Sequence, residues 1–119
     1  EAPAAQASNQ RDEALISDLL RTHVSHIYTE YWTCDKIAFM SQERITCAVL
    51  NNDLQMDVLH NRYTPYITLV QADPHAAYVC PIGFAPAAAM LQHLEQKASK
   101  PGAHYRRSVF AGYLVLQPA

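Results

Sequence analysis

Hydrophobic positions recur along much of the chain at the spacing of an α-helix. Over residues 11–24, Leu15, Leu19 and Leu20 fall between charged positions at close to the helical period, which predicts an amphipathic helix capped by Asn9. The same pattern, with Pro65 and Pro86 at helix starts, predicts three more helices, over residues 31–41, 64–72 and 85–99.

Other segments are short and rich in β-branched and aromatic residues, which is typical of strands. We expect strands over residues 26–29, 45–50 and 76–80. The second and third are nearly continuous apolar runs, as in strands covered on both faces. Residues 105–117 contain two β-rich stretches around Ala111-Gly112, which predicts a closing hairpin.

The alternation of helices and strands indicates the fold class. Such an order is typical of a largely parallel sheet with helices on both faces. We therefore predict an α/β three-layer sandwich, Rossmann-like, with a mainly parallel sheet and a C-terminal antiparallel hairpin. Gly83, Gly102 and Gly112 are too far apart in sequence for a dinucleotide fingerprint or a P-loop, so we expect neither of these nucleotide sites.

Composition favours one domain. Half of the residues are apolar, enough for a core in a chain of 119 residues. Residues 1–10 carry no large apolar side chain and are expected to form a linker or a cut end, with a single α/β domain over 11–119. A net charge of −2 gives no strong field for nucleic acid, so we expect no nucleic-acid partner.

Three cysteines leave the redox state open. Cys34, Cys47 and Cys80 cannot all pair within one chain, and none lies in a C-x-x-C motif. Either all three are buried free thiols, or one disulfide forms, with Cys34 and Cys47 as the candidate pair.

Candidate chemistry gathers after the first predicted strand. Glu30 follows that strand, where parallel sheets open their ligand crevice, and Asp35 and Glu43 are the other plausible acids. Both of these are also read as ordinary solvent-facing or capping acids. No serine or cysteine nucleophile motif is present, so we assign no catalytic residue.

An aromatic pair and a loop arginine are the candidate ligand-binding residues. Tyr31 and Trp32, with Glu30 and Arg62-Tyr63, could converge on a sugar or a phosphate at the carboxyl edge of the sheet. The alternative is that Tyr31 and Trp32 pack the helix onto the sheet, while Arg62 anchors its loop to Glu30 or Glu43. We expect no cofactor and assign no metal ligand, since the three-residue spacing of His23 and His26 is weak evidence for a metal site.

Four stretches of the sequence resemble a known family. They are 27–36, with the letters IYTEYWTCDK, 39–45, 61–66, NRYTPY, and 76–79, AAYV. They resemble the C-terminal soluble region of bacterial multi-pass membrane proteins similar to the dolichyl-phosphate-mannose-protein mannosyltransferases, glycosyltransferase family 39. The resemblance covers about residues 15–117.

The resemblance implies a role outside catalysis. The family's catalytic acid lies in a membrane-embedded part that this chain does not include, so no catalytic residue carries over. We expect a non-catalytic accessory domain on the extracytoplasmic side of the bacterial membrane. Its partners would be its own membrane-embedded region and a glycan or polyprenyl-phosphate sugar.

Two other hypotheses remain open. One is a free-standing carbohydrate- or small-molecule-binding module. The other is a small enzyme that uses Glu30 or Asp35.

Overall fold

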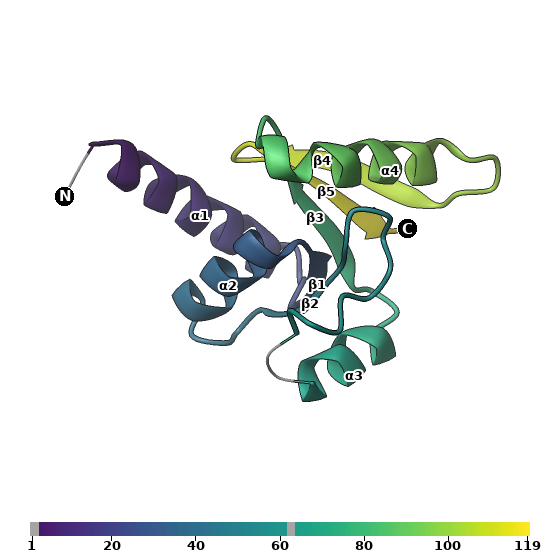
Figure 1. Cartoon of the computed structure of the whole chain (residues 1–119), viewed down its shortest axis with the longest axis horizontal. Helices are drawn as coiled ribbons and strands as arrows, with labels where there is room; N and C mark the ends of the chain where they lie inside the picture. The colour runs from purple at the N-terminus through teal and green to yellow at the C-terminus, as the bar shows by residue number, and fades with distance from the viewer. Residues whose placement is uncertain (1–2, 62–63) are drawn as a thin grey trace.

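A computed structural model describes residues 3–61 and 64–119, and Figure 1 shows its elements in chain order. They are α1 (Pro3–Arg21), β1 (His26–Thr29), α2 (Tyr31–Met40), β2 (Thr46–Val49), α3 (Pro65–Ala72), β3 (Ala77–Pro81), the 3₁₀ turn η1 (Ala85–Ala87), α4 (Ala88–Ser99), β4 (Tyr105–Phe110) and β5 (Tyr113–Pro118). The predicted order of helices and strands is confirmed.

In the described residues the strands form one five-stranded sheet in the order β2-β1-β3-β5-β4. β1 pairs in parallel with β2 and β3, whereas β5 pairs antiparallel with β3 and β4. The prediction of a mainly parallel sheet is therefore not confirmed, because the sheet is mixed. A two-residue turn at Ala111-Gly112 joins β4 and β5, and such a turn can join only antiparallel strands. β5 lies between β3 and β4, so it is antiparallel to both of them.

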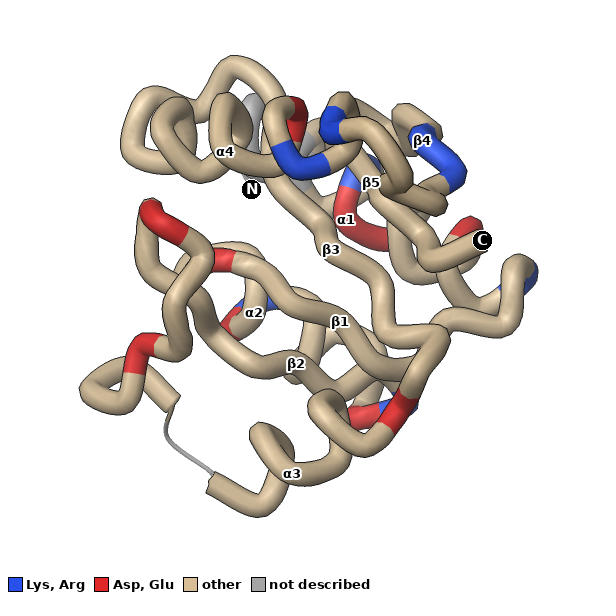
Figure 2. Tube along the Cα trace, turned by 90° about the vertical axis from the view of Figure 1, so that its right-hand side faces the viewer, with Lys and Arg blue, Asp and Glu red and all other residues tan. Residues whose placement is uncertain are grey.

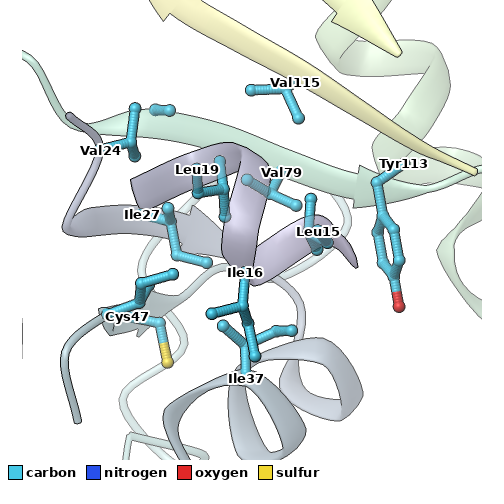
Figure 3. Close-up of a cluster of buried hydrophobic side chains, with 12 residues drawn as sticks. Leu15, Ile16, Leu19, Val24, Ile27, Ile37, Cys47, Val79, Tyr113 and Val115 are labelled. Atoms are coloured by element: carbon cyan, nitrogen blue, oxygen red, sulfur yellow. The ribbon is translucent and has the colours of Figure 1, made fainter. Parts of the chain in front are cut away.

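Helices cover both faces of the sheet. α1 and α2 pack on the face that carries Ile27, Val79 and Val115, as Figure 3 shows for part of this core. α4 packs on Leu114 and Leu116 of the opposite face, and α3 packs on the same face at the β2 side. Figure 2 shows α4 and α3 at the two ends of that face.

α1 begins earlier than predicted. It already starts at Pro3, so Asn9 lies inside the helix and not at its cap. The Ala-rich segment lacks large apolar residues, which suggested a linker, but alanine has the highest helix propensity and proline fits the first helical position. At the other end the helix stops at Arg21, and His23 takes a left-handed conformation with φ of 64°.

The outer edge of β2 is closed by a side chain. The Asn61 amide accepts a hydrogen bond from Val49 N at 2.9 Å and donates one to Val49 O at 3.1 Å. Asp57 N also donates to Val49 O. A single amide side chain thus replaces a neighbouring strand at this position.

No helix in the described part of the chain is long and apolar enough to cross a lipid bilayer.

Candidate functional site

The candidate site lies where the chain leaves the neighbouring strands β1 and β3 toward opposite faces of the sheet. β1 leads into α2 on one face, and β3 leads through η1 into α4 on the other. In α/β sheets such a divergence opens a crevice at the carboxyl ends of the strands. A cavity of about 350 Å³ lies here, which we call the switch-point cavity. It is lined by residues of α1, the start of α2, the loop after β3 and the β4–β5 turn.

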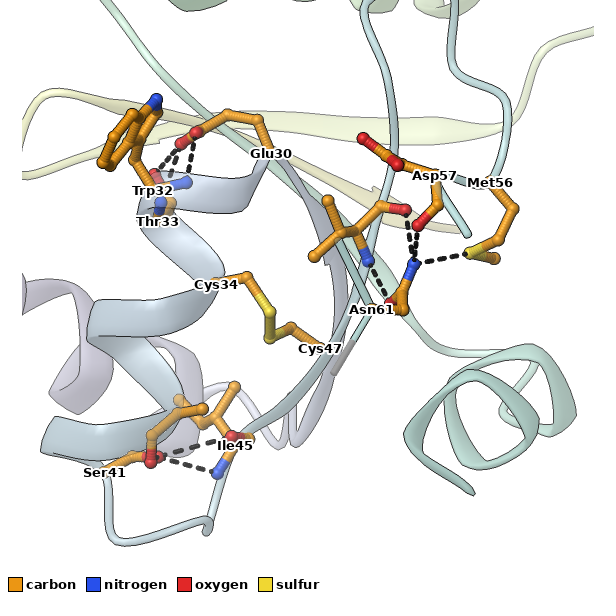
Figure 4. The surroundings of a disulfide bond; sticks show 12 residues. Glu30, Trp32, Thr33, Cys34, Ser41, Ile45, Cys47, Met56, Asp57 and Asn61 are labelled. Carbon is orange, nitrogen blue, oxygen red and sulfur yellow. Dashed lines mark hydrogen bonds between the residues drawn. A yellow bond between two sulfur atoms is a disulfide. The ribbon is translucent and has the colours of Figure 1, made fainter. Parts of the chain in front are cut away.

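Glu30 lies at this cavity as the N-cap of α2. Its carboxylate accepts hydrogen bonds from Trp32 N at 2.7 Å and Thr33 N at 2.9 Å, and from the Thr33 hydroxyl (Figure 4). The first-turn amides of a helix favour a negative charge at this position. The carboxylate of Glu30 therefore orients α2, and its charge is largely compensated inside the protein.

A second carboxylate is buried beside the cavity. Asp12 is only 1% exposed; it accepts a hydrogen bond from the Tyr113 hydroxyl at 2.7 Å and lies 3.0 Å from Lys36 Nζ. Burial, and then the hydrogen bond to Asp12, raise the pKa of Tyr113. Asp12 thus joins α1, α2 and β5. Tyr113 and Lys36 both line the switch-point cavity, so this contact also fixes its wall.

The mouth of the cavity carries exposed apolar side chains. Trp32 is 59% exposed, Ile82 44% and Phe84 37%. Trp32 contacts Tyr31 edge-on, with ring centroids 5.2 Å apart. An accessible indole beside a polar cavity is a common way to bind a flat, partly apolar ligand.

Another cavity, of about 140 Å³, lies beside the disulfide bond. Cys34 of α2 and Cys47 of β2 are bonded, with their Cα atoms 5.7 Å apart (Figure 4). Both cysteines line this disulfide cavity together with Tyr31 and His60, whose rings meet edge-on at 5.1 Å.

Of the two alternatives for the cysteines, the structure therefore shows the Cys34–Cys47 disulfide and not three free thiols. Cys80 is the free thiol of the three, and burial raises its pKa to about 12. A thiol with such a pKa is almost fully protonated at neutral pH and is a poor nucleophile.

The predicted site residues separate into two groups. Glu30 and Trp32 line the switch-point cavity, whereas Tyr31 lines the disulfide cavity. The alternative that Trp32 packs α2 onto the sheet is wrong, because more than half of its surface is exposed. Arg62 and Tyr63 lie outside the described residues.

The candidate acids do not converge on one ligand. Asp35 is exposed and lines the disulfide cavity, away from Glu30. Glu43 accepts a hydrogen bond from the Tyr66 hydroxyl. These three acids therefore do not form a pair of carboxylates for acid and base catalysis at the switch-point cavity.

Sequence reasoning missed Arg11, Lys36, Phe84 and Tyr113, which come from four separate segments of the chain. The sequence pattern of the first helix does not reveal that Asp12, next to Arg11, contacts a tyrosine 101 residues further along the chain. Only the fold brings these residues to the switch-point cavity.

His23 and His26 have different surroundings. His26 Nδ1 lies 2.6 Å from Asp73 Oδ2, which ties the start of β1 to the end of α3, and His23 is exposed. Within the described ranges no group of three or more His, Cys, Asp or Glu side chains is placed to hold a metal ion.

No protein-family model, curated protein or solved structure matches this chain.

Proposed function

We propose that this domain binds a carbohydrate in the switch-point cavity and positions it without carrying out chemistry on it. The observation that carries the proposal is Trp32, an indole 59% exposed at the mouth of a cavity of about 350 Å³. Sugar rings present flat faces of C–H groups, which pack on the electron-rich face of an indole. The polar groups of the cavity then pair with the hydroxyls of the sugar.

The topology of the parallel strands supports the same site. The parallel strands in the order β2-β1-β3 have helices on both faces, and ligands of such α/β sheets bind where the chain diverges. The contacts of Glu30 argue against a catalytic role for this carboxylate. Both of its oxygens already accept hydrogen bonds from the first turn of α2.

We further propose an extracytoplasmic accessory domain of a membrane glycosyltransferase-like protein. The Cys34–Cys47 disulfide supports the compartment, because disulfides persist mainly in oxidising environments outside the cytosol. The sequence stretches that resemble glycosyltransferase family 39 support the parent protein. In that setting the domain presents an acceptor or glycan to the membrane-embedded region.

The test is a panel of soluble mono- and oligosaccharides titrated into the protein and followed by amide chemical shifts. We expect shifts around Trp32 and Phe84 with at least one sugar, and loss of these shifts in Trp32→Ala. The matched control is Phe39→Ala, since Phe39 lies on the same helix, is 84% exposed and does not line the cavity.

Two results would contradict the proposal. One is a panel in which no sugar changes the spectrum. The other is binding that Trp32→Ala leaves intact, which would remove the site even if the protein binds sugars elsewhere.

A further inference from the structure

The charged side chains around the switch-point cavity are not equally compensated. The Glu30 carboxylate is held by the first turn of α2, and the Asp12 carboxylate by Tyr113 and Lys36. Both negative charges thus already have partners inside the protein. A ligand in the cavity meets little uncompensated negative charge.

Arg11 differs from these groups. It lines the switch-point cavity from α1, it is exposed, and within the described residues its guanidinium makes no hydrogen bond or ion pair. Lys36 lines the cavity beside it, with 45% of its side chain exposed, and its ammonium forms an ion pair with Asp12. Of the charged side chains at this wall, Arg11 is therefore the one that no described side chain pairs with.

From this imbalance we propose that the sugar bound here is anionic, with its ring on Trp32 and its carboxylate or phosphate on Arg11. This inference rests on the proposed function. The hydroxyls of a neutral sugar would accept only ordinary hydrogen bonds from Arg11 and would leave its charge uncompensated. A carboxylate or a phosphate accepts two parallel hydrogen bonds from the guanidinium, and charge-assisted bonds of this kind are the stronger class.

The size of the cavity limits the ligand. About 350 Å³ is at the small end of the range for ligand pockets, which suits one or two sugar rings and not a long polymer. The shared chemistry is a pyranose with one anionic group. A uronic acid and a sugar phosphate both satisfy it.

Three matched ligands test the inference: glucose, glucuronic acid and glucose 6-phosphate, titrated calorimetrically at low salt. We expect at least one of the two anionic sugars to bind about tenfold more tightly than glucose, as one additional charge-assisted contact predicts. Arg11→Gln should remove this advantage, so that the variant binds the anionic sugars no more tightly than it binds glucose. The control is Arg21→Gln, on the same helix but paired with Asp18 and not at the cavity.

The outcomes separate the two proposals. Equal affinity for all three sugars, or an advantage that survives Arg11→Gln, overturns this inference and leaves the proposed function standing. Inorganic phosphate that binds as tightly as glucose 6-phosphate also overturns it, because the ring would then contribute nothing. If no sugar in the wider panel binds, the proposed function itself fails.

Discussion

The two halves of the sheet are held together by different means. We call β1, β2 and β3 with α2 and α3 the parallel half, and β4 and β5 with α4 the hairpin half. The parallel half has an apolar cluster that includes Ile27 and Ile37, and in addition the Cys34–Cys47 disulfide and side chains such as Asn61 and Ser41 that hydrogen-bond to the backbone. The hairpin half relies on Met90, Leu94, Leu114 and Leu116, packed around the free thiol Cys80.

Strand length explains the difference. β1 and β2 have only four residues each, whereas β4 and β5 have six and pair along their whole length. A short strand buries less surface and forms fewer ladder hydrogen bonds, so additional links contribute relatively more to its stability. The switch-point cavity takes Glu30 and Trp32 from the parallel half and Tyr113 from the hairpin half. The geometry of the cavity therefore depends on the stability of both halves.

Loss of apolar packing in the hairpin half should have the largest effect. Leu94 is 1% exposed between α4 and β5, so Leu94→Ala should lower the free energy of unfolding by roughly 3 kcal/mol through lost burial and a cavity. Urea denaturation measures this. The control is Gln92→Ala, a change at an exposed position of the same helix, which should have little effect. If Leu94→Ala lowers the free energy of unfolding by less than about 1 kcal/mol, the hairpin half does not depend on its apolar core.

Removal of the disulfide tests the parallel half. The double change Cys34→Ala and Cys47→Ala opens a loop with a sequence separation of 13, which should lower the free energy of unfolding by about 3 kcal/mol. Reductant should destabilise the wild-type protein by a similar amount and leave the double variant unchanged. Combined with Leu94→Ala the losses should add, since the two sites belong to different core clusters. Strong non-additivity would refute the division into halves.

The ion pair at the start of β1 gives the parallel half a pH dependence. The hydrogen bond to His26 lowers the pKa of Asp73. Stabilisation by this carboxylate is complete above its unfolded-state pKa of about 4 and is lost as the pH falls through the lower folded-state value. Asp73→Asn should cost about 1 kcal/mol at pH 5, and the difference from wild type should shrink toward pH 2.

Unfolding curves collected between pH 2 and pH 5 check this prediction. Glu13→Gln, an exposed change on α1, is the control and should show no such trend. A constant difference between wild type and Asp73→Asn at all these pH values would exclude the titration of Asp73 as the cause.

The smallest expected effect is a gain in the hairpin half. Ala111 and Gly112 both have positive φ, 52° and 82°, as a type I′ turn requires, but alanine is strained there. Ala111→Asn should raise the free energy of unfolding by about 0.5 kcal/mol, because asparagine tolerates this conformation better. The urea midpoint measures the gain. Gly112→Ala is the opposite control and should destabilise the protein; a midpoint that does not rise in Ala111→Asn would contradict the strain at this turn.

Local patterns predicted most of the elements. Apolar spacing, proline at helix starts and the Ala111-Gly112 turn all act within a few residues, so α2, α3, α4 and the hairpin follow from them. The position of β5 between β3 and β4 is a long-range choice that no local pattern encodes. The antiparallel hairpin was predicted, but its pairing with β3 through β5 was beyond the sequence. The start of α1 was also missed, because alanine propensity outweighed the lack of apolar residues.

The candidate site was predictable only in part. Glu30 and Trp32 directly follow a strand, and the rule for carboxyl ends of parallel strands identifies them. Arg11 and Tyr113 have no such local signal. Trp32 was also ambiguous, because an aromatic residue at helical spacing packs into a core as readily as it faces a ligand.

The side chain of Asn61 has a consequence for how this protein behaves in a crowded solution. An open strand edge is a template on which another chain can pair and start an aggregate. Because the Asn61 amide occupies both the N–H and the carbonyl of Val49, β2 offers no free backbone groups at that residue. Pairing of another strand is thus blocked at this end of β2, whereas β4, which carries Arg106 and Arg107, is the opposite edge of the sheet.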